Sequence, residues 1–292
     1  MAAQGPVAGR GTERTRFAWG TRTFVMGIVN ATPDSFSGDG VGQDVGLAVA
    51  RGLEQVAAGA DILDIGGEST APGAAPVPAE VELARVLPVI AALRAHTDVP
   101  ISVDTVKAEV AEAALHCGAD VVNDVWGLRR DRHLADVAAA AGAALIVVHN
   151  RPAAAVVDAL GGMYPEVSYG DVVADVRAEL LQAAGWAEAA GVAPQDIWLD
   201  PGIGFGKTPS QNLELLRRLP ELRLGRPLLV GPSRKSFIGR VLEVPAPARD
   251  PGTAAAVALC AAGGADVVRV HNVRDMAMAA RPADAVCRGW PG

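Results

Sequence analysis

One stretch of the chain combines residue types that could bind a charged ligand. The segment 200–208 begins with a carboxylate, contains three glycines within five residues, and ends with a cation and a hydroxyl. Glycine allows left-handed backbone conformations and lets a ligand approach bare amides, so an anion could sit against these N–H groups beside Lys207. A tight turn with a solvated lysine would explain the same sequence equally well, because glycine-rich turns are common. Other residues must decide between the two interpretations.

Polar residues follow seven other short apolar runs in the same way. They are Asn30, Glu68, Asp104, Asn123, Asp124, His149, Asn150, Ser233, Arg234, Lys235, Ser236, Arg269 and His271. Each has an ordinary structural explanation, such as a solvent-facing turn or the N-cap of the next helix. Such explanations at eight equivalent positions would be a large coincidence, so we expect these residues to share one site.

By chemical type, these residues form two half-sites. The first consists of Asp104, Asn123, Asp200 and Lys235. A carboxylate accepts paired N–H donors and an amide both donates and accepts, so this set suits a flat heterocycle with an amino-pyrimidinone edge. The second consists of Asn30, Arg269, His271 and the backbone of the glycine-rich loops. Such groups bind anions, so this set suits a phosphate, with or without a divalent cation.

The elements that must position these residues are strands alternating with helices. Apolar, β-branched runs predict strands at 24–29, 61–65, 100–103, 120–122, 144–148, 197–199, 227–230 and 266–270. Helical periodicity predicts helices near 43–59, 79–95, 107–118, 132–142, 170–191, 210–218, 252–264 and 273–287. Eight such units indicate an α/β fold with a parallel sheet, a single (β/α)8 TIM barrel whose active site lies at the strand C-termini. An open doubly wound sheet is the alternative.

Three segments fall outside this repeat. Residues 1–16 lack the apolar region of a secretory signal and are expected to form a disordered extension before one barrel domain over 17–292. Residues 17–23 are expected to form a short N-terminal hairpin that plugs one end of the barrel. Residues 150–168 are expected to form a long irregular loop, and loops of that length are usually functional or mobile.

Composition excludes several classes of function. The 292 residues are 50% hydrophobic, enough for a full core, and the net charge of 26 − 33 = −7 gives no support for nucleic-acid or membrane binding. No apolar run reaches the length of a membrane span. Three cysteines without paired spacing argue against a disulfide framework or a zinc site. We therefore expect a soluble, cytoplasmic protein that acts on small molecules.

Lysine usage points to the same strand ends. The three lysines of the chain, Lys107, Lys207 and Lys235, all follow predicted strands, and arginine is used elsewhere. A compact, flexible ammonium is not interchangeable with a guanidinium fork. Because lysine occurs only after three predicted strands, we expect these strand ends to have a function.

Seven motifs, in order along the chain, carry a resemblance to a known family. They are 26–37 (MGIVNATPDSFS), 64–70 (DIGGEST), 101–105 (ISVDT), 123–125 (NDV), 200–208 (DPGIGFGKT), 233–239 (SRKSFIG) and 269–271 (RVH). The chain resembles the dihydropteroate synthases, pterin-binding TIM-barrel enzymes of the folate pathway that sulfonamides target. The resemblance covers roughly residues 20–287. Single motifs of this set mean little alone, whereas their combination is specific.

The resemblance implies a reaction and its requirements. The enzyme would join 4-aminobenzoate to the methylene of 7,8-dihydropterin-6-ylmethyl diphosphate, giving 7,8-dihydropteroate and diphosphate, with Mg²⁺ as cofactor and a homodimer as the assembly. Departure of diphosphate would leave a cation at the pterin carbon, stabilised by carboxylates, while cations stabilise the leaving anion. The aniline nitrogen would then attack without a covalent nucleophile. Loops after the first two strands would close and exclude water.

The resemblance also implies roles for individual residues. Asp104, Asn123, Asp200, Phe205 and Lys235 would hold the pterin, with Asp104, Asp200 and Lys235 catalytic. Asn30, Arg269 and His271 would hold the diphosphate, and Asn30 would ligate Mg²⁺. Phe36, Thr70, Ser233 and Arg234 would flank the aminobenzoate. Lys207 keeps only a supporting role that the sequence does not specify.

The chain departs from the family pattern at three places. Ala71 stands where the second strand-end loop usually carries arginine, which removes a cation near the aminobenzoate. Gly38 follows Ser-Phe-Ser where aspartate is usual, and Asp39 comes one residue later. Val148 replaces the methionine that usually precedes the histidine of the fifth strand. The residues of the pterin half-site are therefore retained. The main departures, at Ala71 and at Gly38 and Asp39, lie in the two loops that are expected to close over the site as a lid.

Two further hypotheses come from these departures and from related barrels. Ala71 motivates a non-catalytic or weakly active pterin-binding paralogue, which would bind pterin without turnover. A pterin-dependent methyltransferase has a related barrel, but the motifs at 32–36 and 233–235 suit a diphosphate and an aromatic amine.

Overall fold

The chain folds into a closed barrel of parallel strands. The computed structural model describes residues 15, 17–32, 44–71 and 73–290. One sheet has the strand order β8-β5-β4-β3-β2-β1-β10-β9, and a bridge between Leu199 and Leu228 joins its two ends. The strands are β1 (Phe24–Asn30), β2 (Ile62–Gly66), β3 (Ile101–Asp104), β4 (Val121–Asp124), β5 (Ala144–Val148), β8 (Ile197–Asp200), β9 (Leu229–Val230) and β10 (Val267–Val270). The predicted (β/α)8 barrel is confirmed, and the open doubly wound sheet is excluded.

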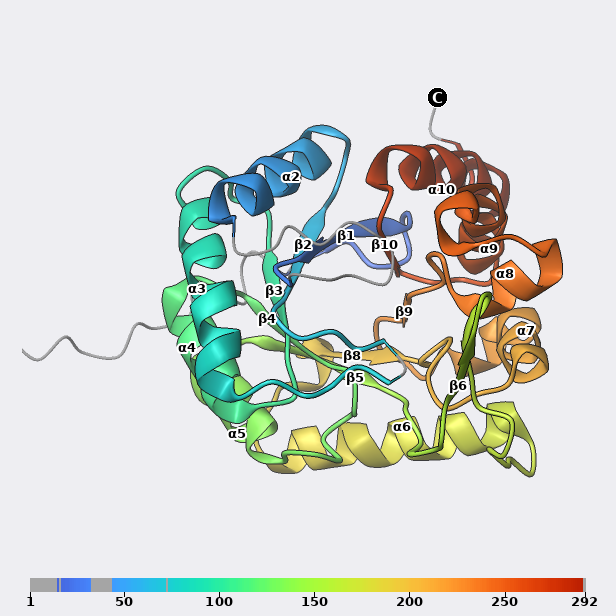
Figure 1. Ribbon diagram of the computed structural model, residues 1–292, viewed down its shortest axis with the longest axis horizontal. Coiled ribbons are helices and arrows are strands. Elements are labelled where there is room, and N and C mark those ends of the chain that lie inside the picture. The colour runs from blue at the N-terminus through green and yellow to red at the C-terminus, as the bar shows by residue number, and fades with distance from the viewer. Residues whose placement is uncertain (1–14, 16, 33–43, 72, 291–292) are drawn as a thin grey trace, which may run out of the picture.

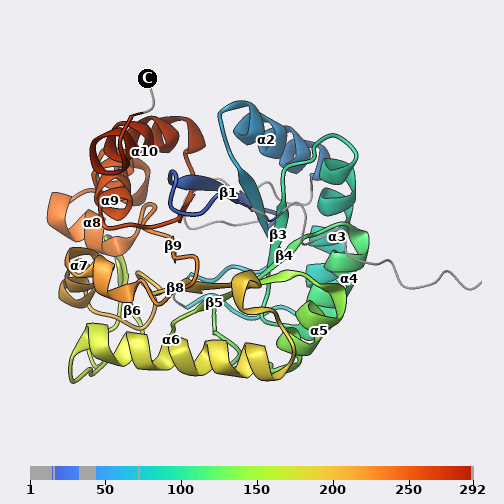
Figure 2. The same ribbon diagram turned by 180° about the vertical axis from the view of Figure 1, so that it is seen from behind.

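Helices surround the strands, as Figure 1 shows from one end and Figure 2 from behind. They are α2 (Val45–Ala57), α3 (Ala79–Arg94), α4 (Ala108–Cys117), α5 (His133–Ala141), α6 (Val172–Ala189), α7 (Pro209–Arg217), α8 (Ser236–Leu242), α9 (Asp250–Ala262) and α10 (Val273–Arg288). The eight predicted helices correspond to α2–α7, α9 and α10. Helix α8 adds to the prediction, because its 7 residues make barely two turns and show no clear period. No described helix is long and apolar enough to span a membrane.

Apolar side chains pack on both faces of the barrel wall. An outer cluster fills the space between strands and helices. An inner cluster fills the barrel itself and consists of Phe24, Met26, Ile62, Val121, Ala144, Ile146, Val148, Trp198, Leu229 and Val267. Successive side chains of a strand point to opposite faces, so every barrel strand except β3 supplies both clusters. The filled interior leaves the strand ends as the place for polar groups.

Phe17 and Trp19 pack against the barrel end at which the strands begin. The Phe17 ring lies 4.7 Å from that of Phe24, and the Trp19 ring lies 5.2 Å from that of Trp198, between centroids. The expected plug is therefore present, but the expected hairpin was wrong, because residues 17–23 form turns without strand pairing. Backbone N–H groups here donate to aspartate side chains, as Gly20 does to Asp266, or to carbonyls of the same turns, as Thr21 does to Ala18.

The N-terminal extension is described at only one position. Thr15 is buried, and its carbonyl accepts a hydrogen bond from the N–H of Phe17. The rest of the segment 1–16 lies outside the described residues.

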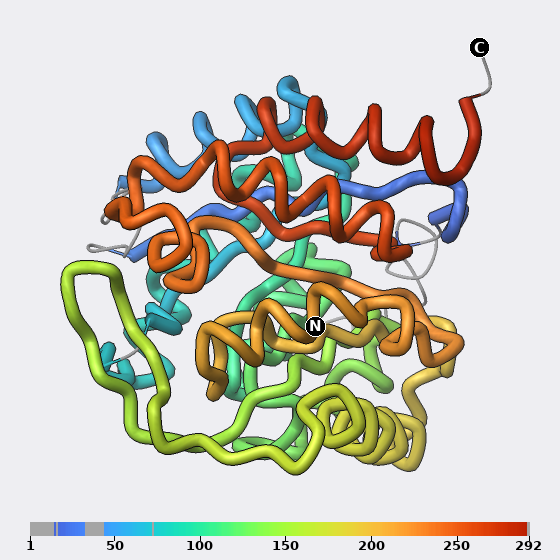
Figure 3. Tube along the Cα trace, turned by 90° about the vertical axis from the view of Figure 1, so that its right-hand side faces the viewer, coloured from blue at the N-terminus to red at the C-terminus, as the bar shows by residue number. Residues whose placement is uncertain are grey.

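The loop after β5 contains a hairpin that the sequence did not reveal. Strands β6 (Val156–Asp158) and β7 (Gly161–Met163) pair antiparallel and project to one side of the molecule (Figure 3). The hairpin is fixed to the barrel because the buried Arg249 donates to the carbonyl of Leu160 at 3.0 Å, and Arg240 pairs with Asp158 at 3.0 Å. The prediction of an irregular loop over 150–168 is therefore wrong for 156–163, which guanidinium contacts hold in place, and agrees with the structure at 150–155 and 164–168.

Candidate active site

Strand register brings the predicted residues to one rim of the barrel. Asn30 lies opposite Gly66, Gly66 opposite Asp104, and Asp104 opposite Asn123, so the ends of β1 to β4 form one layer. Asp200 is the last residue of β8. Strand β8 pairs with β5, and β5 pairs with the edge of β4 that faces away from β3. Because all strands are parallel, these side chains meet at their common C-terminal rim.

Asp104, Asn123 and Arg269 form a buried polar cluster around a residue to which the sequence assigned no role, Asp64. The Oδ2 atom of Asp64 accepts from Nε of Arg269 at 2.6 Å and from Nδ2 of Asn123 at 3.1 Å. Arg269 also donates from Nη2 to Oδ2 of Asp104 at 2.7 Å. Oδ1 of Asn123 and Oδ1 of Asp64 are buried without a hydrogen-bond partner among the described residues. These oxygens are acceptors available to a ligand with N–H donors.

Two carboxylates share one guanidinium in this cluster, and the sharing has an electrostatic consequence. Burial raises the pKa of Asp104 to about 7; Arg269 opposes this shift, and Asp64 adds to it. The cause is that a desolvated charge is unfavourable and a neighbouring carboxylate makes it more so. Near neutral pH Asp104 can therefore exchange a proton as a ligand enters.

Asp200 and Lys235 lie across the rim from this cluster. Asp200 accepts from the N–H of Gly202 at 2.7 Å, and burial raises the pKa of Asp200 to about 6, against the opposing charge of Lys235. The ammonium of Lys235 stands 3.9 Å from the centroid of the Phe205 ring. Burial lowers the pKa of Lys235 to about 8, and Arg269 contributes to that shift. Asp200, Lys235 and Phe205 together offer a carboxylate, a cation and an aromatic face to one ligand.

The anion half-site opens into the same cavity. A cavity of about 120 Å³ is lined by Asn30, Asp104, Phe205, Ser233, Lys235, Arg269 and His271, among others. Nδ1 of His271 lies 2.9 Å from Oγ of Ser233, and this hydroxyl also accepts from the N–H of His271 at 3.2 Å. The expected diphosphate residue and the expected aminobenzoate residue therefore hold each other in place. A second cavity of about 330 Å³ shares Asp104 and Phe205 with the first.

Arg234 lines the cavity with its side chain already engaged. Its guanidinium pairs with Asp250 through two contacts of 2.7 and 3.0 Å. Its backbone is left-handed, with φ 53°, which is unusual for a residue with a side chain. A hydrogen bond from its N–H to Oγ1 of Thr253, at 3.1 Å, helps to maintain this conformation. Strain of this kind is common at functional sites.

The loop after β2 borders both cavities through Glu68, Thr70 and Ala71. Lys107 holds this loop, because its ammonium pairs with Glu68 and, at 2.5 Å, with the fully buried Glu82 of α3. The first of the three lysines thus anchors a loop and does not face the cavity. Thr70 and Ala71 are half-buried at the rim.

Part of the predicted lid lies outside the described residues. Phe36, Gly38 and Asp39 belong to segment 33–43, which the structure does not describe. Val148, the conservative departure, is buried in the barrel interior, and Phe205 packs against the same cluster. The apolar floor beneath the site is therefore continuous.

The oxygen donors at the rim fit a magnesium ion that arrives with a phosphate-bearing substrate. Mg²⁺ is commonly bound by one or two protein oxygens together with substrate phosphates. The amide oxygen of Asn30 and Oδ2 of Asp104 both approach Gly66 from neighbouring strands, 3.9 and 4.0 Å from where its Cβ would stand. Within the described part of the chain, no three acidic, histidine or cysteine side chains gather as a metal centre. Asn30 and Asp104 are therefore the residues whose oxygens could hold a metal ion at this rim.

Two buried carboxylates were missed by the sequence reasoning. Asp64 sits inside an apolar strand, and a charged residue at such a position is a signal that could have been used. Glu82 lies on helix α3 among ordinary helix formers, and nothing in its local sequence marks it. Every predicted site residue that the structure describes lies at the barrel mouth.

Comparisons with known proteins agree with this geometry. Residues 26–271 match the protein family described as pterin binding enzymes. The chain is 48% identical over 277 residues to a dihydropteroate synthase of Synechocystis sp., covering 94% of each protein.

Two solved structures extend the comparison. A dihydropteroate synthase of Clostridium difficile, solved in the presence of pteroic acid, superimposes with a TM-score of 0.85 at 44% identity, covering 94% of this chain and 100% of that one. The enzyme of Xanthomonas albilineans with 4-aminobenzoic acid gives a TM-score of 0.81 at 43% identity, covering 92% and 94%. The chain belongs to the dihydropteroate synthase family of pterin-binding enzymes.

Proposed function

We propose that the protein condenses 4-aminobenzoate with 7,8-dihydropterin-6-ylmethyl diphosphate to give 7,8-dihydropteroate and diphosphate. The observation that carries the proposal is the joint position of Asp104, Asn123, Asp200, Lys235 and Arg269 at one barrel rim. The relatives solved with pteroic acid and with 4-aminobenzoic acid bind the corresponding chemical groups. Both carboxylates and the Asn123 amide offer acceptors for the N–H donors of a pterin ring.

In this proposal, Asp104, Asn123, Asp200 and Lys235 hold the pterin, and Phe205 supplies an aromatic face. As the bond to diphosphate breaks, positive charge grows on the pterin methylene carbon. Asp200 and Asp104 would stabilise that cation with their negative charge, and preorganised charges of this type contribute strongly to catalysis. The bonding electrons leave with the diphosphate oxygen, and no covalent bond to the protein forms.

Arg269, His271 and Asn30 receive the diphosphate in the same proposal. Arg269 touches both half-sites, since it pairs with Asp104 and lines the cavity beside Asn30. Magnesium bound to the diphosphate would neutralise charge on the leaving group, with Asn30 as the proposed protein ligand. The aniline nitrogen then attacks the methylene carbon from the side of Thr70, Ser233 and Arg234. Phe36, outside the described residues, is proposed to border the same side.

The proposal also covers the domain organisation, the location and the assembly of the protein. We propose one barrel domain over 17–292 following a disordered extension at 1–16, a cytoplasmic location, and a homodimer. Exposed apolar side chains on neighbouring helices α8 to α10, among them Val241, Leu259 and Met278, support the homodimer. Sedimentation velocity tests the assembly directly.

Release of diphosphate tests the proposed function. Purified protein with Mg²⁺ and the pterin diphosphate should release diphosphate only when 4-aminobenzoate is added, and 7,8-dihydropteroate should form in equal amount. No release under these conditions would refute the assignment. Pterin binding without release would instead favour the paralogue, for which Ala71 at the rim of both cavities is the supporting observation. Methyl transfer from methyltetrahydrofolate would support the methyltransferase.

A further inference from the structure

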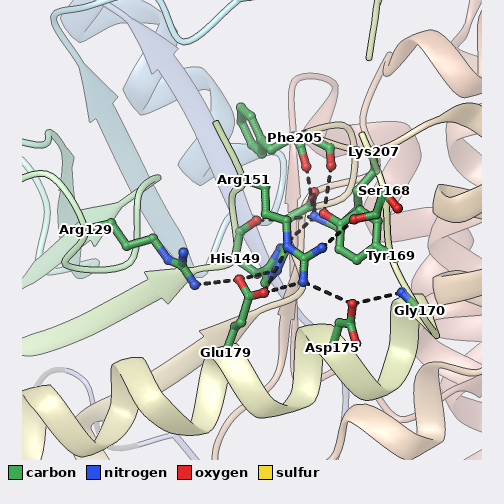
Figure 4. A network of polar contacts seen from close by, with 12 residues as sticks. Arg129, His149, Arg151, Ser168, Tyr169, Gly170, Asp175, Glu179, Phe205 and Lys207 are labelled. Carbon is green, nitrogen blue, oxygen red and sulfur yellow. Dashed lines mark hydrogen bonds and ion pairs between the residues drawn. The ribbon is translucent and has the colours of Figure 1, made fainter. Parts of the chain in front are cut away.

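The ammonium of Lys207 is enclosed by main-chain carbonyl oxygens beneath the active site. Lys207 is 1% exposed, and its Nζ donates to the carbonyls of Gly202 and Phe205, each at 2.9 Å. The carbonyl of His149 lies 3.3 Å away, and Nδ1 of the same histidine lies 2.9 Å away. We call these four acceptors the ammonium cage. Figure 4 shows the cage and its surroundings.

The cage offsets part of the cost of burying the Lys207 charge, and burial still lowers the pKa of this lysine to about 7. An ammonium has three donors and no acceptor, and burying it without partners is strongly unfavourable. Burial and the charge of Lys207 lower the pKa of His149 to about 4, so the imidazole is neutral and Nδ1 can accept. Nε2 of His149 lies 3.1 Å from Oε2 of Glu179. The neutral ring therefore lies between the ammonium and a carboxylate on α6, although Nε2 makes no hydrogen bond to any described residue.

A second set of contacts holds the cage from outside. Glu179 pairs with Arg151 at 2.5 Å and with Arg129 at 2.5 Å, so the loops after β4 and β5 converge on one carboxylate (Figure 4). The hydroxyl of Tyr169 donates to the carbonyl of Gly206 at 2.7 Å, and Arg151 stacks on the Tyr169 ring. The glycine-rich loop is thus clamped between its own lysine and the loop after β5.

Two of the glycines in segment 200–208 are required by this packing. Gly202 has φ 67°, and a Cβ there would overlap the carbonyl oxygen of His149. Gly206 has φ 53°, and a Cβ there would overlap the carbonyl oxygen of Arg151. These glycines allow backbone to approach backbone, rather than a ligand to approach backbone. The anion cradle that the spacing allowed at Lys207 is therefore not what the segment forms.

The cage is linked to both pterin-facing groups through single residues. Gly202 accepts from Lys207 with its carbonyl and donates to Oδ1 of Asp200 with its N–H, at 2.7 Å. Phe205 accepts from Lys207 with its carbonyl, and its ring supports the ammonium of Lys235. A shift of the cage must therefore move the Asp200 carboxylate and the Phe205 ring together.

We propose that Lys207 is a positioning residue for pterin binding, which fixes Asp200 and Phe205 by holding residues 202–206 around its ammonium. The inference rests on the proposed function, because it concerns the same substrate. Lys207 touches no substrate in this scheme. In this proposal Lys207 affects pterin binding and not aminobenzoate binding, because Thr70 and Ser233, which are expected to flank the aminobenzoate, belong to other loops.

Calorimetric titration with 6-hydroxymethyl-7,8-dihydropterin tests the inference independently of turnover. Lys207→Ala should weaken pterin binding by at least about tenfold, since a lost charge-assisted network disorders the carboxylate that binds the ring. The KM for the pterin diphosphate should rise in proportion, with a smaller change in the KM for aminobenzoate. Arg226→Ala is the matched control, because this cation also binds a main-chain carbonyl, that of Pro194, but away from the site. It should leave pterin affinity unchanged.

Chemical rescue separates positioning from general destabilisation. Lys207→Ala removes the atoms of a propylammonium ion and leaves the carbonyl oxygens in place. Added propylammonium should therefore restore pterin affinity, whereas tetramethylammonium at equal ionic strength should not, because it has no N–H donors. Rescue supports the inference, and a folded variant that binds pterin as the wild type does overturns it.

A second variant decides the matter if Lys207→Ala does not fold. Gly206→Ala keeps the lysine but pushes the loop away from Arg151, and it should weaken pterin binding in the same way. Wild-type pterin affinity in Gly206→Ala would overturn the inference. If the wild-type protein itself bound no pterin, the proposed function and this inference would fall together. Wild-type pterin binding without turnover would leave the inference standing and remove only the proposed reaction.

Discussion

Nη2 of Arg269 lies 2.7 Å from Oδ2 of Asp104, so the expected diphosphate ligand and an expected pterin ligand form an ion pair across the barrel mouth. Nε of the same guanidinium is bound to Asp64, which has no exposed surface. Arg269 therefore sits at the boundary between the two half-sites. Its position depends on the carboxylate of Asp64, to which the sequence assigned no role.

Asp64→Asn should weaken the site without removing any predicted ligand. The variant keeps the shape of the side chain but loses the charge that fixes Arg269, a contact worth about 1.5–3 kcal/mol. We expect kcat/KM for the pterin diphosphate to fall at least about tenfold. Asp61→Asn is the control, since Asp61 pairs with Arg22 at the opposite end of the same strand. Equal activity in the two variants would show that Asp64 does not position Arg269.

Lys235→Ala and Asp200→Asn test the two groups on the other side of the rim. Each removes one charged contact to the pterin, so each should lower kcat/KM by at least about tenfold, or roughly 1.5–3 kcal/mol. Arg217→Ala is a charge-matched control, because Arg217 is an exposed residue that pairs with Glu214 on its own helix. Wild-type turnover in Lys235→Ala or in Asp200→Asn would refute its assignment to the site.

The sequence predicted the barrel and the rim because both follow from local patterns. Apolar runs mark strands, and parallel strands place Asp104, Asn123 and Asp200 at one end whatever the packing details. The ammonium cage could not be predicted in the same way. Three of its four acceptors are main-chain carbonyls, which cannot be identified from residue types. The fourth, Nδ1 of His149, comes from 58 positions away in the chain. Even so, segment 200–208 contained the signal, since Gly202 and Gly206 are both required by close backbone contact.

The role of Asp64 was hidden for a related reason. An aspartate next to strand residues such as Leu63 and Ile65 has several possible explanations, and only strand register shows that it faces Arg269. The same holds for the β6–β7 hairpin, which depends on the buried Arg249 and its contact to Leu160. Long-range polar contacts decide such features, and they leave little trace in local periodicity.

Pterin affinity should fall as the pH falls. Burial raises the pKa of Asp200 to about 6 and the pKa of Asp104 to about 7, above the usual 3.8. The N–H donors of the ring bind the ionised carboxylates, so below these pKa values binding must displace protons. Calorimetry should show weaker binding at about pH 5 than at about pH 7.5. Proton release should appear as a binding enthalpy that changes with the ionisation enthalpy of the buffer.

Asp200→Asn should remove part of this pH dependence, because one of the two titrating groups is gone. The remaining dependence should follow Asp104 and lie near neutral pH. Affinity that stays constant over the same range, with no proton release, would contradict the raised pKa of both carboxyl groups.

Ala71→Arg tests whether the missing lid cation limits the second substrate. Ala71 borders both cavities, and its N–H donates to Oγ of Ser69 at 3.3 Å, so a longer side chain would start from an ordered backbone. A guanidinium there could reach the aminobenzoate carboxylate. The KM for aminobenzoate should fall by about threefold to tenfold, as expected for a partly exposed charge contact. Pterin affinity should not change.

Ala74→Arg provides the control for charge alone. Ala74 lies on the same loop but is exposed and borders only the larger cavity. If both variants lowered the KM for aminobenzoate equally, general attraction of an anion would explain the effect, and added salt would abolish it. An effect confined to Ala71→Arg would instead locate the missing contact at the rim. In that case the loop after β2, and not the pterin half-site, sets the difference between this chain and the usual family pattern.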